Sequence, residues 1–178
     1  KTLLAEAIEM KDEIVENRRA IPRAPEVGAH LPQTVQFVEE KLRLLGYEPC
    51  ELGGGVVAEL TGEDMGRCIL LRADMDALKV REKTDLPFRS ENGSMHACGH
   101  DGHAAMLLGT AHVLSEIRDQ LCGTVYLCFQ VAEEIGAGAD EIVAYLKSIG
   151  GVDQAIGTHL AGGDPAGVIN LPDGPMMA

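Results

Sequence analysis

The spacing of apolar residues predicts two amphipathic helices at the start of the chain. Over residues 2–19 the apolar positions recur on one helical face: Leu4, Ile8 and Val15. Pro22 and Pro25 follow, and proline cannot continue a helix because it lacks the backbone N–H. Residues 32–45 repeat the pattern, and Gly46 stands where a helix C-cap is expected.

A strand-like pattern follows Gly46. The glycines at 53–55 separate two short apolar runs, over residues 47–52 and 56–60, which predicts a β-hairpin. The run at 68–71 is apolar throughout, as in a strand buried on both faces of a sheet. The later elements alternate: a helix with Asp101 as its N-cap, a strand over 124–129, a helix over 140–148, and strands over 154–158 and 167–171.

Alternating strands and helices predict an α/β fold. We expect a three-layer sandwich in which a mixed, largely parallel sheet is flanked by helices on both faces. Ligands of such sheets bind at the carboxyl ends of the strands. Three predicted strands are followed there by carboxylates or a histidine: Asp74 and Asp76, Glu133 and Glu134, and His159. The sequence therefore predicts one polar site at this edge of the sheet.

Composition narrows the classes of partner and compartment. The net charge of −13 disfavours binding to nucleic acid or to an anionic membrane surface, because like charges repel. The longest apolar run is also far too short to cross a bilayer. The five cysteines are odd in number and lack a CxxC motif, so we expect no disulfide framework and a cytoplasmic, reducing location.

The segment from Met95 to His103 contains three histidines, one cysteine and one aspartate. Thiolate and imidazole are preferred ligands of Zn²⁺ and similar transition metals. Cys98 and His100 lie two positions apart, so they project to the same side of an extended loop. The alternative is a polar loop with hydrogen-bonded histidines, which stays open for His96 and His103 taken singly. The remaining histidines are expected at the surface: His30 and His112.

Two pairs of carboxylates could complete such a site. Glu133 and Glu134 are adjacent, so one can bind a metal while the other faces the substrate as a base. Asp74 and Asp76 share one face of an extended segment. They could be ligands or could hold a ligating imidazole in one tautomer, and we favour the second role. His159 ends an apolar strand. The alternative to a metal ligand at this position is an ordinary core or turn residue.

These motifs together resemble a known enzyme family. The chain shares four motifs, in order and spacing, with the metal-dependent aminoacylase and carboxypeptidase-like amidohydrolases: Arg-Ala-Asp-Met-Asp-Ala-Leu, Met-His-Ala-Cys-Gly-His-Asp-Gly-His, Phe-Gln-x-Ala-Glu-Glu and His-Leu. It is most similar to the branch that contains hippurate hydrolase, the plant indole-acetyl-amino-acid hydrolases and N-acetyl-diaminopimelate deacetylase. Residues 17–26 and 174–178 also look like that branch.

The resemblance implies a role for each candidate residue. Two divalent transition metals, Zn, Mn, Co or Ni, would be bound by Cys98, His100, Glu134 and His159. Glu133 would be the general base on a water that bridges the metals. Asp76 would orient a metal-bound histidine and so serve catalysis with Glu133. The implied reaction is hydrolysis of the amide bond of N-acyl amino acids, or of related short peptide-like amides.

Members of that family are longer than this chain. The resemblance implies that residues 1–178 are the N-terminal part of the catalytic domain. The lid domain, which usually makes the dimer contact, and the C-terminal part, which supplies one more histidine ligand, would lie beyond. A homodimer is therefore expected only of the full-length protein. Three positions depart from the family. Lys79 and Val131 stand where the family usually has proline, and Pro22 stands where it usually has histidine.

Two other functions stay open on the sequence alone. A truncated, non-catalytic module could bind a metal or a partner chain through the same residues. A thiol enzyme could instead use Cys98 as nucleophile, with His100 or His159 as base. The thiol enzyme leaves Glu133 and Glu134 without a role.

Overall fold

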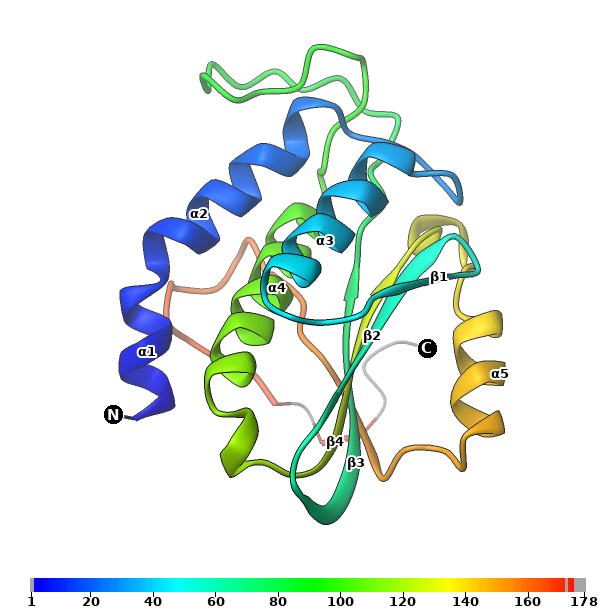
Figure 1. Ribbon diagram of the computed structural model, residues 1–178. Coiled ribbons are helices and arrows are strands. Elements are labelled where there is room, and N and C mark those ends of the chain that lie inside the picture. The colour runs from blue at the N-terminus through cyan, green and yellow to red at the C-terminus, as the bar shows by residue number, and fades with distance from the viewer. Residues whose placement is uncertain (1, 172, 175–178) are drawn as a thin grey trace.

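A computed structural model describes residues 2–171 and 173–174 of the protein, which form one mixed sheet with helices on both faces (Figure 1). The helices are α1 (Leu3–Glu9), α2 (Lys11–Ala20), α3 (Pro32–Leu44), α4 (His100–Glu116) and α5 (Asp140–Ser148). The strands are β1 (Cys50–Leu52), β2 (Gly55–Thr61), β3 (Asp64–Asp74), β4 (Cys122–Gln130) and β5 (Gln154–Gly157). Three short 3-10 helices complete the elements: Ile21–Arg23, Arg118–Gln120 and Glu133–Ile135.

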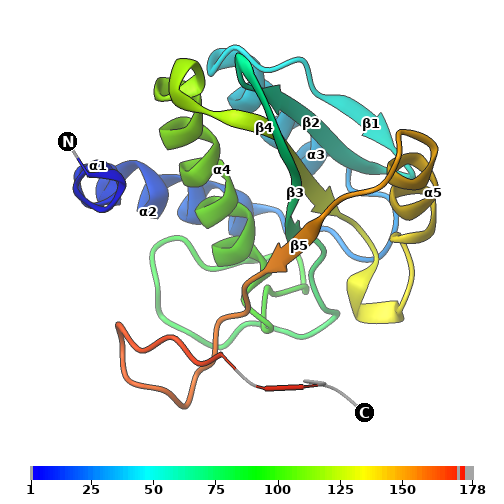
Figure 2. The ribbon, with the colours of Figure 1, turned by 90° about the horizontal axis from the view of Figure 1, so that it is seen from below.

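The five strands lie in the order β1-β2-β4-β3-β5. The β1–β2 hairpin and the β2–β4 pair are antiparallel, whereas β3 pairs in parallel with both β4 and β5. Figure 2 shows α5 on the opposite side of the sheet from α4. These observations confirm the predicted α/β class with a mixed sheet and flanking helices.

The two faces of the sheet explain why its central strands are so apolar. Along β4, Leu127 and Phe129 pack in the large core with α3 and α4, while Tyr126 and Cys128 pack against α5. Side chains alternate between the faces of a strand, so a strand that is covered on both faces needs apolar residues at every position. The α5 face is closed by Ile142 and its neighbours.

The sheet brings three strand ends to one edge. In the parallel pairs, Asp74 at the end of β3 lies beside Gln130 of β4, and Arg72 lies beside Gly157 of β5. The residues that follow each strand therefore leave the sheet close together. This edge is where the carboxylates and His159 were expected.

Several local predictions were right. The helix at 140–148 has the expected bounds, the hairpin forms at residues 50–61, and the helix at 32–44 begins with a proline in its first turn. Gly46 follows that helix with φ of 83°, a left-handed conformation that glycine adopts without steric cost.

Three local predictions were wrong. The expected helix over 2–19 is divided at Met10 into α1 and α2. Residues 167–171 form no strand. Asp101 lies inside the first turn of α4, because Gly99 with φ of 94° takes the N-cap position. Part of the closing motif at 174–178 lies outside the described residues. Among the described helices, none is long and apolar enough to cross a membrane.

The core packing makes a prediction about Phe129 of β4, which is fully buried in the core that the sheet shares with α3 and α4. Phe129→Ala should lower the free energy of unfolding by about 3–5 kcal/mol, because it removes a large side chain and leaves a cavity. Leu44→Ala is the control, since Leu44 is 81% exposed and should change stability by less than about 0.5 kcal/mol. Urea unfolding followed by circular dichroism measures both, and equal stabilities would contradict this packing.

Candidate active site

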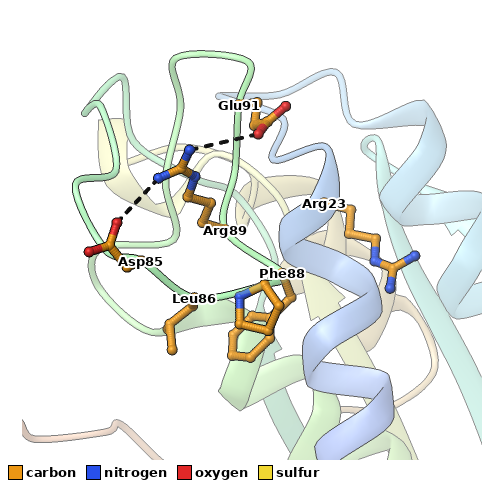
Figure 3. A pocket seen from close by; sticks show the side chains of 7 residues that line it. Arg23, Asp85, Leu86, Phe88, Arg89 and Glu91 are labelled. Carbon is orange, nitrogen blue, oxygen red and sulfur yellow. Dashed lines mark ion pairs between the residues drawn. The ribbon is translucent and has the colours of Figure 1, made fainter.

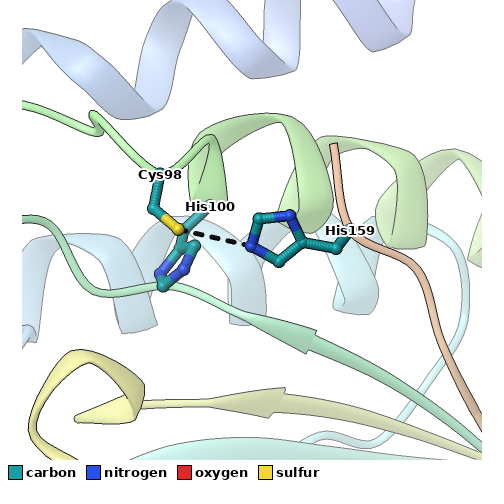
Figure 4. Close-up of side chains that lie close together, drawn as sticks. All are labelled: Cys98, His100 and His159. Carbon is teal, nitrogen blue, oxygen red and sulfur yellow. Dashed lines mark hydrogen bonds between the residues drawn. The ribbon is translucent and has the colours of Figure 1, made fainter. Parts of the chain in front are cut away.

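Cys98 and His159 meet although they lie 61 residues apart in the sequence. The Cys98 Sγ is 3.3 Å from the His159 Nε2 (Figure 4). Cys98 precedes α4, and His159 follows β5, so the contact joins a helix start to a strand end. The Nδ1 of His159 is 2.8 Å from the carbonyl oxygen of Leu160. A carbonyl can only accept, so Nδ1 carries the proton and Nε2 keeps its lone pair in the neutral ring.

The backbone positions Cys98 beside the end of β3. Leu78 and Met95 form an antiparallel bridge with two N–H···O bonds of 3.0 and 2.9 Å, which returns the long loop at 79–94 to the sheet edge. Gly99 then turns the chain into α4 through its positive φ. Cys98 and His100 consequently flank the start of one helix, close to the end of β3.

His100 is the centre of the polar cluster and is fully buried. Its Nε2 is 3.7 Å from one carboxylate oxygen of each of three residues: Asp74, Glu133 and Glu134. Burial by itself would lower the pKa of His100, but the nearby carboxylates of Asp76, Asp74 and Glu134 raise it above its usual value. Negative charge therefore converges on a single ring nitrogen.

Asp76 lies on the other side of the His100 ring. Its Oδ1 is 3.3 Å from His100 Nδ1, and its Oδ2 accepts a 3.1 Å hydrogen bond from the backbone N–H of Glu134. Asp76 thus touches both a candidate ligand and the backbone that carries another. A carboxylate in this position can restrict the orientation of the imidazole ring beside it.

Glu133 and Glu134 follow β4 through a strained turn. Ala132 adopts φ of 58° and ψ of 26°, the left-handed region that residues with a Cβ rarely occupy. Strain of this kind persists only where the surroundings impose it and is frequent at functional sites. The Glu133 side chain is 32% exposed, whereas Glu134 is 17% exposed. The adjacent carboxylates therefore face different environments.

Asp74 and His103 form a second buried pair. The Asp74 Oδ1 is 2.5 Å from His103 Nδ1, and its Oδ2 accepts a 2.8 Å hydrogen bond from Arg72. Burial opposes ionisation of Asp74, but the bond to His103 and the positive charges nearby keep its pKa below the usual value. The sequence left the role of His103 open and predicted no role for Arg72, which opens the Arg-Ala-Asp motif. The His-Asp-Gly-His spacing could have indicated a role for His103, because it places this residue one helical turn after Gly99.

Two further histidines lie outside the cluster around His100 and His159. His112 lies near Glu13 and Glu116, and His30 is exposed, as expected. His96 is buried close enough to Asp76 and His100 for their charges to affect its pKa, which burial lowers overall. A cavity of about 590 Å³ is separate from the cluster (Figure 3). Its lining includes Arg23 of the turn after α2, and Phe88 and Arg89 of the loop at 79–94.

The donor atoms fit divalent transition metals. Three groups each place their ligand atoms within 4.8 Å of one another: Cys98, His100 and His159; His100, Glu133 and Glu134; and Asp74, His100 and His103. Both ring nitrogens of His100 and Oε1 of Glu134 are buried without a hydrogen-bond partner among the described residues. Buried polar atoms of this kind are costly unless something pairs with them. Thiolate, imidazole and carboxylate together suit Zn²⁺ and its neighbours.

Known proteins are similar to this chain in sequence. The chain is 42% identical over 96% of its length to an N-acyl-L-amino acid amidohydrolase of Geobacillus stearothermophilus, and 43% identical over 96% to thermostable carboxypeptidase 1 of Saccharolobus solfataricus. It covers 47% and 44% of those proteins, so it spans about half their length.

A solved structure agrees with these relatives. The YXEP protein of Bacillus subtilis, a dinuclear metal-binding peptidase of the M20 family, matches 92% of this chain with a TM-score of 0.86 and 39% identity, and 47% of its own length is covered. The model of peptidase family M20/M25/M40 matches residues 70–173, which include every candidate site residue. The match covers more than half of the chain and confirms the resemblance seen in the motifs, so the protein belongs to peptidase family M20/M25/M40.

Proposed function

We propose that this chain carries the metal-binding and proton-transferring part of a hydrolase that cleaves the amide bond of N-acyl amino acids or short peptide-like substrates. The observation that carries the proposal is the convergence of a thiol, a second imidazole and two glutamates around His100. The names of the similar proteins, an N-acyl-amino acid amidohydrolase and a carboxypeptidase, support this substrate class. Five free cysteines, in turn, support a reducing location such as the cytoplasm.

The proposed metal ligands are Cys98, His100, Glu134 and His159, with two divalent ions, Zn, Mn, Co or Ni, as the bound metals. When bound, such ions lower the pKa of a water that they share and polarise the substrate carbonyl. The excess of carboxylates around the buried His100 would then be balanced by cation charge. Asp76 keeps the His100 ring in place from the opposite side.

Glu133 is the proposed general base. It is more exposed than Glu134, so its carboxylate is the one that a substrate and its water can reach. Glu133 would take a proton from the attacking water and deliver it to the amine that leaves, which frees a carboxylic acid and an amino acid. Glu134 would remain with the metal, as its lower exposure and its position against His100 favour.

The Cys98–His159 contact also has the composition of a thiol nucleophile with its base. A working thiol nucleophile needs a lowered pKa. In this protein burial, followed by the charges of Glu134 and Glu133, raises the pKa of Cys98 to about 11. The acidic surroundings therefore favour metal chemistry over a thiol mechanism.

The thiol alternative is tested by alkylation of metal-free protein. Because the pKa of Cys98 is raised to about 11, its thiol is protonated at neutral pH. Its reaction with iodoacetamide should be slow at pH 7 and rise about tenfold per pH unit up to pH 10, since only the thiolate reacts. Mass spectrometry of the labelled peptide measures the rate, with exposed Cys50 as internal reference. A rate already at its plateau at pH 7 would favour a thiol nucleophile.

The metal site is tested by Cys98→Ala. The variant should bind Zn²⁺ more than about 100-fold more weakly. Loss of a residue that only hydrogen-bonds to a ligand already lowers metal affinity by roughly 10–100-fold, and loss of a ligand should lower it further. Competition with a chromophoric chelator measures the affinity. Cys50→Ala is the matched control, because Cys50 is exposed and lies in β1. Equal affinities of the two variants would exclude Cys98 as a ligand.

The general base is tested by Glu133→Gln, which keeps the size of the side chain and removes its charge. Hydrolysis of an N-acetyl amino acid should fall by roughly 10²–10⁴-fold while Zn²⁺ remains bound. The amino acid released and the metal content are measured on the same samples. If the parent protein binds metal but hydrolyses no amide, the alternative of a non-catalytic metal-binding module is favoured. Activity that resists chelators but is lost on alkylation would favour the thiol enzyme.

A further inference from the structure

His159 is the candidate ligand with the least support from secondary structure. It follows β5, an edge strand whose four residues are all exposed. Residues 158–171, all of which the structure describes, form neither helix nor strand and are exposed. A metal ligand must nevertheless be held to within about 0.5 Å. Something outside the sheet must therefore fix the His159 ring.

The backbone of Leu160 supplies one fixed point. Its N–H donates a 2.8 Å hydrogen bond to Nε2 of His103, which is buried in the first turn of α4. A backbone N–H can only donate, so Nε2 of His103 carries the lone pair, and Nδ1 carries the proton that faces Asp74. Both nitrogens of His103 are thus in use, and His103 is not free to bind a metal as well. Arg72 in turn holds Asp74 from the other side.

The side chain of Leu160 supplies a second fixed point. A Cβ on Gly102 would lie 2.5 Å from Cδ1 of Leu160, and a Cβ on Gly99 would lie 3.3 Å from the same atom. Leu160 therefore rests directly on the backbone of the α4 start, in space that two glycines leave open. The carbonyl of Leu160 also accepts the Nδ1 proton of His159, which orients the ring toward Cys98.

We propose that His103 is a positioning residue for His159. Held by Asp74, it anchors the Leu160 N–H to α4 and so keeps Nε2 of His159 facing Cys98. The helix that begins the metal site thereby also secures the ligand that arrives from the edge strand. This inference rests on the proposed function, because it concerns how one of the proposed ligands is held.

Two substitutions of His103 separate its two hydrogen bonds. Asn reaches only the position of Nδ1, so His103→Asn keeps a donor for Asp74 and loses the acceptor for Leu160. Gln places its amide oxygen near the position of Nε2, so His103→Gln restores that acceptor. Zn²⁺ affinity, measured by competition with a chromophoric chelator, should fall about 10–100-fold in the Asn variant and recover in the Gln variant.

A double-mutant cycle distinguishes positioning from a general effect on the fold. If His103 acts through His159, the variant with both His103→Asn and His159→Ala should bind Zn²⁺ as weakly as His159→Ala alone. Fold losses that multiply would overturn the proposal, because they would show that His103 acts independently of His159. An Asn variant with the affinity of the parent protein would also overturn it.

A second pair of variants avoids the buried core. Leu160→Ala removes the packing on Gly102 and Gly99 from a residue that is 42% exposed, and it should weaken Zn²⁺ binding several-fold. Leu171→Ala is the matched control in the same segment, since Leu171 is 89% exposed, and it should bind as the parent does. Equal binding by the two variants would overturn the anchoring role of Leu160.

The outcomes also separate this inference from the proposed function. If His159→Ala and Cys98→Ala both bind Zn²⁺ like the parent protein, the metal site itself is wrong, and the positioning role falls with it. If both weaken binding while His103→Asn and Leu160→Ala do not, the metal site stands and only the positioning role is overturned.

Discussion

The structure depends on a buried imidazole that is surrounded by carboxylates. His100 has no exposed surface, and its Nε2 lies 3.7 Å from oxygens of Asp74, Glu133 and Glu134. Removing several negative charges from water is costly unless positive charge compensates them. Arg72 and His103 engage Asp74, but Oε1 of Glu134 has no hydrogen-bond partner among the described residues. A divalent cation is the compensation that such a set of donors fits.

The parallel part of the sheet makes this concentration possible. Parallel neighbours β3, β4 and β5 end at the same edge, so residues that are distant in sequence leave the sheet together. Helices cover both faces of the sheet, so the central strands are largely apolar, and the carboxylates and the histidine of the cluster lie at or beyond the strand ends. The strained Ala132 and the left-handed Gly99 then turn the chain so that Glu133 and His100 approach each other.

The start of α4 has two functions in this arrangement. Cys98 and His100 adjoin it, while His103, one turn later, receives the backbone of Leu160. The edge strand β5 is exposed and could not hold His159 by itself. The site is therefore assembled on a helix that is packed in the core, and the exposed segment after β5 is held by a direct hydrogen bond to that helix. Asp74 links this anchor to the cluster, because it contacts both His103 and His100.

The sequence by itself determined the fold class and the residue types of the site. Apolar periodicity located α3, α5 and the central strands, and the Cys-Gly-His and Glu-Glu motifs located the metal-binding candidates, because these signals are local. Only the tertiary structure decided the division of the first helix at Met10, the start of α4 at Gly99 and the absence of a strand over 167–171. It also decided the use of both His103 nitrogens, since a hydrogen bond between α4 and Leu160 depends on long-range packing that no local pattern contains.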